Sequence, residues 1–168
     1  MHKTFIFWIF LVLLVSCKGE KDQAIATETS SFEIRTEKWP KKTVPNSKTK
    51  ELIKDWKEFN ELQIGFDALY NIGNTEDLSL VLEDLIEKQK ALQESDYPET
   101  FDKPQIKSRQ KVFHTFILKT KGDLIYRVNS EKSVLEMIKA HNTMLTQMNS
   151  ITGNTLDLKT ILEENEIE

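Results

Sequence analysis

The chain has 168 residues, which is enough for one domain with a sizeable core and little more. Its 23 Lys and Arg residues are outnumbered by 27 Asp and Glu residues, for a formal net charge of −4, and this balance argues against a nucleic-acid-binding protein. With 5 glycines and 4 prolines, the composition excludes collagen-like and Pro/Gly-rich disordered chains.

The N-terminus begins with a short polar and basic stretch, His2 and Lys3, followed by an unbroken apolar run over residues 5–15. This run has the length of the apolar core of a signal peptide. It is too short for a membrane-spanning helix, which needs about 20 residues. Residues 14–17 then read Leu-Val-Ser-Cys, and a polar stretch starts at Lys18.

Residues 14–17 resemble the lipobox of bacterial lipoproteins, with Leu at position −3, a small residue at −1 and Cys at +1. The resemblance covers the first 17 of the 168 residues. It implies that residues 1–16 are a signal peptide cut between Ser16 and Cys17. It also implies that Cys17 is acylated with fatty chains such as palmitate and becomes the new N-terminus. Two alternatives are an uncleaved N-terminal anchor helix and a plain secretory signal that leaves a free thiol.

The residues after the cysteine bear on where such a lipoprotein resides. The residue after Cys17 is Lys18, whereas an inner-membrane lipoprotein would have Asp there. In this respect the chain is similar to lipoproteins passed on to the outer membrane. The charged residues 18–22 partly resemble the surface-export signals of Bacteroidetes lipoproteins, although Gly19 interrupts them. We therefore expect an outer-membrane lipoprotein of the cell envelope, and both the periplasmic face and the cell surface stay open.

Residues 17–45 are predicted to form the lipidated N-terminus and a flexible linker. Phe32 and Ile34 alternate with charged residues, which predicts a short extended piece that docks on the domain. Trp39 lies among lysines and could contact a membrane surface or a partner. Packing of Trp39 on the helices is the favoured interpretation.

Residues 46–168 are predicted to form a helical-bundle domain. A first helix should begin at Asn46 or Ser47, both good N-caps, and should end at Gly73 in the left-handed conformation. Its apolar residues recur every three or four positions, as one buried face requires. They are Leu52, Trp56, Phe59, Leu62, Phe66 and Leu69.

A second helix should begin at Asn74 or Thr75 and run to a break at residues 95–103. Its apolar residues are Leu78, Val81, Leu82, Leu85, Ile86 and Leu92. Asp102 and Gln105 stand at capping-box spacing, and Pro104 fits the first turn of a third helix. The apolar residues of that helix are Ile106, Val112, Phe113, Phe116, Ile117, Leu124 and Val128.

A fourth helix should follow Ser130 as its N-cap and should end at residues 152–154, which read Thr-Gly-Asn. Leu158, Ile161 and Leu162 predict a short fifth helix that folds back on the others. Short connections make consecutive helices antiparallel neighbours. The predicted fold is therefore all-α: an up-down antiparallel four-helix bundle with a short fifth C-terminal helix, preceded by a signal peptide and a flexible tether.

Few residues suggest catalysis. A di-iron bundle needs Glu-x-x-His twice, but Lys111 precedes His114 and Ile138 precedes His141 at that spacing. A single cysteine allows no intramolecular disulfide, and its assignment to lipid excludes a thiolate nucleophile and a cysteine metal site. We therefore expect no catalytic residues, no cofactor and no enzymatic activity.

One constellation could bind a soft metal. Met137, His141, Met144 and Met148 fall on one side of the fourth helix, and thioether and imidazole groups suit Cu(I). The favoured interpretation is that these side chains fill the core, so no metal site is assigned. Similarly, the aromatic side chains of Trp56, Phe59, Phe66, Phe113 and Phe116 could line an apolar ligand slot, but they are expected to fill the core.

The sequence thus predicts a lipid-anchored helical domain of the bacterial envelope that acts by binding or scaffolding. Its expected partners are the membrane, through the N-terminal lipid, and an envelope protein, with no nucleic acid. The alternative is a periplasmic lipoprotein that binds a small ligand or copper.

Overall fold

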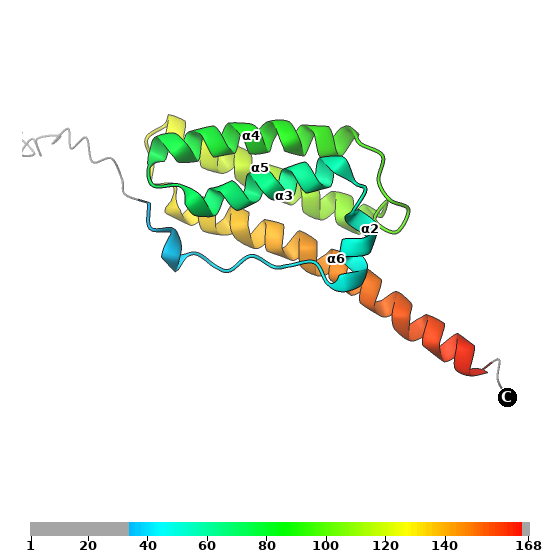
Figure 1. The fold of residues 1–168 in the computed structure, drawn as a ribbon. Helices are drawn as coiled ribbons and strands as arrows, with labels where there is room; N and C mark the ends of the chain where they lie inside the picture. The colour runs from blue at the N-terminus through cyan, green and yellow to red at the C-terminus, as the bar shows by residue number, and fades with distance from the viewer. Residues whose placement is uncertain (1–33, 166–168) are drawn as a thin grey trace, which may run out of the picture. The chain divides into compact units, whose positions relative to one another are not determined.

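Helices make up most of the described chain. The computed structural model describes the backbone of residues 34–165 and the side chains of residues 34–153. Within these bounds lie α2 (Ser47–Ile53), α3 (Lys57–Ala68), α4 (Thr75–Glu94), α5 (Pro104–Ile125) and α6 (Glu131–Asn165), and no strand (Figure 1). The predicted all-α class is confirmed for this part of the chain. The signal peptide and Cys17 lie outside the described residues.

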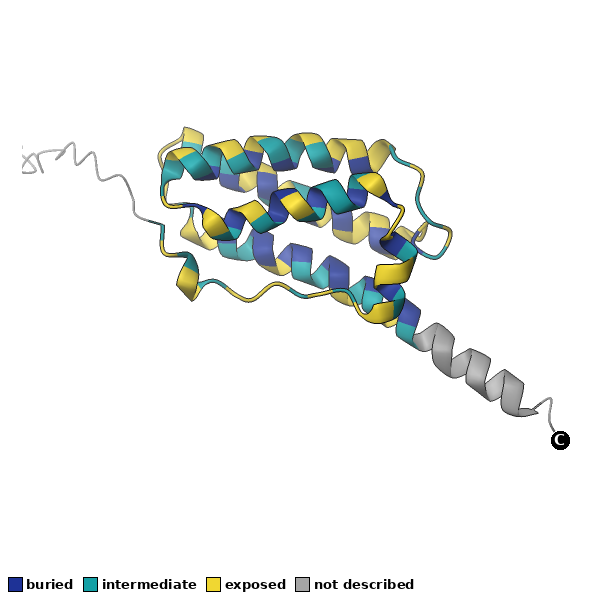
Figure 2. Ribbon diagram, in the orientation of Figure 1, coloured by how far each residue is buried: buried dark blue, intermediate teal, exposed yellow. Residues whose placement is uncertain are grey.

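The helices pack in chain order, with α3 against α4, α4 against α5, and α5 against α6. The short helix α2 contacts both α3 and α6. Buried residues lie along the inward sides of the long helices, and exposed residues cover the outside (Figure 2). The core includes Phe59, Leu62, Phe66, Leu78, Leu82, Leu85, Phe113, Ile117, Ile138 and Leu145.

The first predicted helix is interrupted, which corrects the prediction of one helix from Asn46 to Gly73. The N-cap is as expected, because Asn46 Oδ1 accepts the N–H of Thr49 at 2.8 Å. However, α2 ends at Ile53 and α3 begins at Lys57. The change of direction places Ile53 rather than Leu52 in the core.

Two side chains stabilise this break. The Asn60 amide donates to the carbonyls of Ile53 and Lys54 at 2.9 and 3.1 Å, which satisfies acceptors left free at the end of α2. Trp56 is 4% exposed, stacks on Phe59 with ring centroids 5.0 Å apart, and donates from Nε1 to Ser95 Oγ at 2.9 Å. Burial of this indole favours the break over a continuous helix.

A left-handed helix stop occurs at Arg127 and not at Gly73. No described glycine has a positive φ, and Gly73 instead follows a 3₁₀ turn at Leu69–Asn71 and an extended Ile72. Arg127 has φ 54°, its N–H donates to Leu124 at 3.1 Å, and the N–H of Val128 donates to Asp123 at 2.8 Å. These two hydrogen bonds form a Schellman motif, which ends α5.

The predicted starts of α4 and α5 are confirmed, but the predicted cap of α5 is not. Asn74 caps α4 as predicted, accepting the N–H of Asp77 at 2.8 Å. Pro104 opens α5 as predicted, but its N-cap is Lys103, without a side-chain cap. The expected capping by Asp102 is wrong, because its carboxylate pairs with Lys107 at 2.5 Å. Within the described residues, Val112 and Val128, expected in the apolar stripe, are exposed.

The predicted end of the fourth helix at residues 152–154 is wrong. The helix α6 continues from Glu131 to Asn165, so the described backbone contains no separate fifth helix. Glycine lowers helix stability by about 1 kcal/mol but does not by itself end a helix. Thr152 is fully buried and hydrogen-bonded to Thr49 of α2 at 2.9 Å, and this packing holds α6 together across Gly153.

Residues 34–46, which we call the arm, lie against the helices (Figure 1). The N–H of Ile34 donates to the carbonyl of Gly73 at 3.3 Å, and Ile34 packs on the core, as predicted for an extended docking piece. Trp39 is half-buried and packs edge-on against Tyr70 with centroids 6.1 Å apart, which confirms the favoured interpretation. The linker prediction is therefore corrected for residues 34–45, which are docked and not free.

Candidate functional site

The arm crosses α6 beside Asn142, whose side-chain amide forms two hydrogen bonds with the arm backbone. Asn142 Oδ1 accepts the N–H of Thr43 at 2.8 Å. Asn142 Nδ2 donates to the carbonyl of Lys41 at 3.0 Å. The amide therefore pairs with the arm as a neighbouring β-strand would.

Asn149 repeats this arrangement two helical turns later. Its Oδ1 accepts the N–H of Asn46 at 2.9 Å, and its Nδ2 donates to the carbonyl of Val44 at 3.0 Å. In each case the amide joins a carbonyl to the N–H two residues further along the arm. One side chain thus satisfies two backbone groups of an extended segment.

The spacing of the two asparagines matches the spacing of the arm. Seven residues of helix rise about 10.5 Å, at 1.5 Å per residue. The three-residue step from the carbonyl of Lys41 to that of Val44 spans about 10 Å in an extended chain, at 3.3 Å per residue. The helix and the arm therefore stay in register, so that Asn142 and Asn149 can each form their two hydrogen bonds with the arm.

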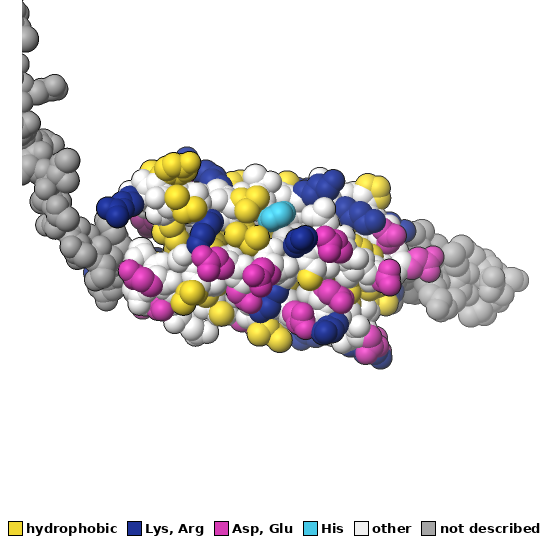
Figure 3. All heavy atoms as spheres, turned by 90° about the horizontal axis from the view of Figure 1, so that it is seen from above, with side chains coloured by type: hydrophobic (Ala, Val, Ile, Leu, Met, Phe, Trp, Pro, Cys, Tyr) yellow, Lys and Arg dark blue, Asp and Glu magenta, His cyan; other side chains and the backbone are white. Residues whose placement is uncertain are grey.

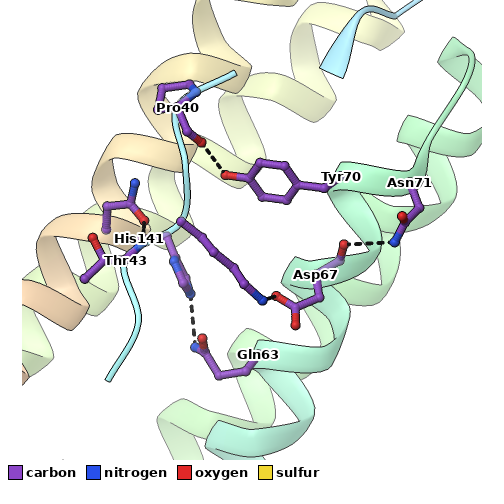
Figure 4. Close-up of polar contacts among 9 residues, drawn as sticks. Pro40, Thr43, Gln63, Asp67, Tyr70, Asn71 and His141 are labelled. Atoms are coloured by element: carbon purple, nitrogen blue, oxygen red, sulfur yellow. Dashed lines mark hydrogen bonds and ion pairs between the residues drawn. The ribbon is translucent and has the colours of Figure 1, made fainter. Parts of the chain in front are cut away.

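The end of α3 and the 3₁₀ turn that follows it hold the arm through three further contacts. The Tyr70 hydroxyl donates to the carbonyl of Pro40 at 2.7 Å (Figure 4). Lys42 forms an ion pair with Asp67, and Trp39 packs on Tyr70. An open pocket of about 500 Å³ remains between Lys41 and Lys42 of the arm and the α3 end, where Asp67, Tyr70 and Asn71 line it.

His141 lies beside this junction and is fully buried. Its ring stacks on Phe66 with centroids 3.6 Å apart and meets Phe113 edge-on at 5.2 Å. Gln63 Nε2 lies 3.0 Å from His141 Nε2 and joins α3 to α6. Among the described residues, Nδ1 of His141 has no hydrogen-bond partner.

The environment of His141 strongly favours the neutral imidazole. Burial lowers the pKa of His141 from 6.5 to about 3; the neighbouring Asn142 side chain opposes this shift only in part, and the positive charge of Lys42 adds to it. A protonated imidazole would lose its hydration without gaining an anionic partner. His141 is therefore neutral at physiological pH.

The candidate soft-metal residues lie along one side of α6, where Met137 and Met148 are separated by about 16 Å of helix axis. Met137, His141, Met144 and Met148 are all at most 1% exposed, on the inward side of α6. No group of three or more His, Cys, Asp or Glu side chains suited to a metal ion occurs within the described residues. The favoured interpretation, core packing, agrees with this burial.

The aromatic residues considered for a ligand slot lie in or beside the core. Trp56, Phe59, Phe66 and Phe113 are at most 4% exposed, and Phe116 is half-buried. Trp56 also contacts Tyr97 at 4.9 Å, and Phe66 meets Phe113 edge-on at 5.8 Å. These rings pack against one another and fill the space between the helices.

Sequence reasoning missed the residues that bind the arm. Asn142 and Asn149 occupy polar positions beside the buried stripe of α6, where an amide looks like an ordinary half-solvated side chain. The only sequence feature that pointed to them was their separation by seven residues, which places both on the same side of a helix. Tyr70 and Gln63 gave no signal, because their partners lie 30 and 78 positions away in the chain.

Exposed apolar side chains form a second surface feature. Apolar side chains are interspersed with charged ones on the face of the molecule in Figure 3. The large exposed ones at and after the end of α5 are Ile125, Tyr126 and Val128. They are 66%, 80% and 57% exposed, so the described part of the chain leaves them largely uncovered.

No known protein family, curated protein or solved structure matches this chain significantly. The described helices include none with the length and apolar character needed to cross a membrane.

Proposed function

We propose that the protein is a lipid-anchored lipoprotein of the bacterial cell envelope whose helical domain acts by binding or scaffolding. The observation that carries this proposal is Cys17, which stands at the +1 position of the Leu-Val-Ser-Cys sequence after an apolar run. The proposed location is the outer membrane, on its periplasmic face or at the cell surface. The proposed partners are the membrane and an envelope protein, with no nucleic acid and no enzymatic role.

Two structural features support a binding role. The arm lies along α6 and is held through its backbone, so this surface of the domain can hold an extended segment. Exposed apolar side chains at the end of α5 offer a contact surface. These features suit a protein that presents surfaces to other molecules.

For the fold, we propose that α3, α4, α5 and α6 form an up-down antiparallel four-helix bundle. Consecutive helices pack on each other and are joined by short connections, which favours antiparallel neighbours. The hydrogen bond from Gln63 to His141 and the stacking of Phe66 on His141 join the first of these helices to the last. These contacts supply the fourth side of such a bundle.

Replacement of Cys17 by serine tests the anchor. The variant is expected to stay unlipidated and uncut, because the hydroxyl does not replace the thiol as lipid acceptor. Detergent phase partitioning and intact-mass measurement of the cell-derived protein should show the loss of acyl chains. Ser16→Ala is the matched control, since it keeps a small residue before the cysteine and should remain lipidated. A C17S protein that partitions like wild type would refute the anchor.

A soft-metal site is the second candidate, and one observation favours it. His141 Nδ1 is buried and has no partner among the described residues, and buried Met137, Met144 and Met148 share its side of α6. Thioether and imidazole ligands suit Cu(I). The charge of Lys42 near His141 opposes this candidate.

Anaerobic titration of Cu(I) into the full chain tests the metal site. If the site exists, His141→Ala combined with Met144→Leu should abolish binding, since both ligand types are removed. His114→Gln is the control, because it removes a half-buried histidine of α5 and leaves this cluster intact. An isotherm that the double variant leaves unchanged, or no binding by wild type, eliminates the candidate.

A further inference from the structure

We propose that the surface of α3 and α6 that holds the arm is a binding site for extended peptide segments, and that residues 39–46 occupy it as an intramolecular competitor. We call this surface the arm site; it consists of Asp67, Tyr70, Asn142 and Asn149. The inference deepens the proposed binding role by naming its partner class, an extended polypeptide. It does not depend on the lipid anchor.

Recognition at the arm site is directed mainly at the backbone. Five backbone groups of the arm are bound, namely the carbonyls of Pro40, Lys41 and Val44 and the N–H groups of Thr43 and Asn46. Every polypeptide has these groups, so the site does not require the arm's own sequence. Backbone pairing of this kind is how proteins bind peptides that add as a strand.

The prolines of the arm reveal which positions the site restricts. Pro40 contributes its carbonyl, and no hydrogen bond to the arm site uses the nitrogen of Pro45. Thr43 and Asn46 must each donate an N–H, which proline lacks. A partner segment can therefore carry proline at the positions of Pro40 and Pro45. It cannot carry proline at the positions of Thr43 and Asn46.

Two side-chain contacts supply selectivity. Asp67 pairs with Lys42, so a partner with a basic residue at this position gains an ion pair. Trp39, three residues before Lys42, packs against Tyr70, and this contact favours an aromatic residue at the Trp39 position. In contrast, Lys41 and Val44 of the arm are exposed, so the residues at those positions are unrestricted. The expected partner is an extended segment with an aromatic residue three positions before a basic one.

The arm competes with such a partner because it is covalently attached. The apparent dissociation constant of an outside peptide rises as the fraction of molecules with a vacant site falls. A change that weakens the arm without altering the arm site should therefore tighten binding of a peptide from solution. Thr43→Pro is such a change, because it removes one bound N–H and leaves Asn142 in place.

The test uses the full-length chain in detergent and a fluorescent peptide with the sequence of residues 37–47. We expect Thr43→Pro to bind this peptide at least about tenfold more tightly than wild type, in proportion to the larger vacant fraction. Adding Asn142→Ala to Thr43→Pro should remove most of this binding. A peptide with proline in place of Thr43 is the matched control and should bind weakly to every variant.

Lys42→Glu serves as a second arm variant, since it repels Asp67 and keeps the backbone unchanged. It decides the question if Thr43→Pro fails to fold, as judged by circular dichroism. Equal peptide affinity of the folded arm variants and wild type, or no measurable binding to any of them, overturns the proposal. Loss of lipidation in Cys17→Ser would overturn the anchor alone, so the two failures are distinguishable.

Discussion

Replacement of Phe66 by alanine is expected to lower the free energy of unfolding by about 3–5 kcal/mol. Phe66 is fully buried on α3. Its ring stacks on His141 of α6 at 3.6 Å and meets Phe113 of α5 edge-on at 5.8 Å. Truncation would leave a cavity between three helices that these rigid rings cannot close, so the loss should lie in the upper part of the range for large-to-small changes.

Urea unfolding followed by circular dichroism measures this effect. Ile64→Ala is the matched control, because Ile64 lies on the same helix but is 67% exposed, and its truncation should change stability by about 0.5 kcal/mol or less. A loss below about 1 kcal/mol for Phe66→Ala would show that Phe66 does not join the three helices. Phe66→Leu should be intermediate, since it retains part of the buried volume.

Helix starts and buried faces were predictable because both depend on local chemistry. Asn46 and Asn74 accept the N–H groups that the first turn of a helix leaves free, and the chain shows such caps directly. Pro104 stands where the fixed φ of proline fits the first turn. Likewise, Leu78, Leu82 and similar residues at spacings of three and four identify the inward side of α4.

Interruptions of helices were not predictable from the same signals. The apolar spacing continues from Ile53 through Trp56 to Phe59, and the break depends on Asn60 binding free carbonyls and on Trp56 reaching Ser95. In the opposite case, Gly153 looks like a helix end, but α6 continues because buried Thr152 contacts α2. Tertiary contacts decided both cases, overriding local propensity.

The arm site depends on register between distant segments, which composition does not encode. Thr43 and Asn142 are 99 positions apart, and Asn46 and Asn149 are 103 apart. The spacing of seven between the asparagines gains meaning only when an extended segment lies along the helix. The sequence did predict the docking of Ile34 and Trp39, since apolar side chains in a polar stretch indicate a packing contact.

His141 joins the core to the arm site, because it contacts the rings of Phe66 and Phe113 and lies next to Asn142 in α6. Sequence reasoning expected its side chain to fill the core. The structure buries it fully and leaves Nδ1 without a hydrogen-bond partner among the described residues. A buried histidine of this kind makes stability depend on pH.

We expect the free energy of unfolding to fall by about 2 kcal/mol between pH 7 and pH 5 because of His141. In the folded protein the pKa of His141 is about 3, whereas in the unfolded chain it returns to about 6.5. Between these values the unfolded chain binds a proton that the folded protein does not, so acidification favours unfolding. The contribution of neutral His141 to the free energy of unfolding is fully present above pH 6.5 and is lost progressively as the pH falls toward 3.

Urea unfolding at several pH values measures this dependence. His141→Phe keeps an aromatic ring against Phe66 and removes the titrating group, so the fall in stability between pH 7 and pH 5 should largely disappear. His114→Gln is the control, because it removes a histidine on α5 outside this contact and should retain the fall. The same pH dependence in His141→Phe and wild type would mean that another group responds to acid and that His141 is solvated in the folded protein.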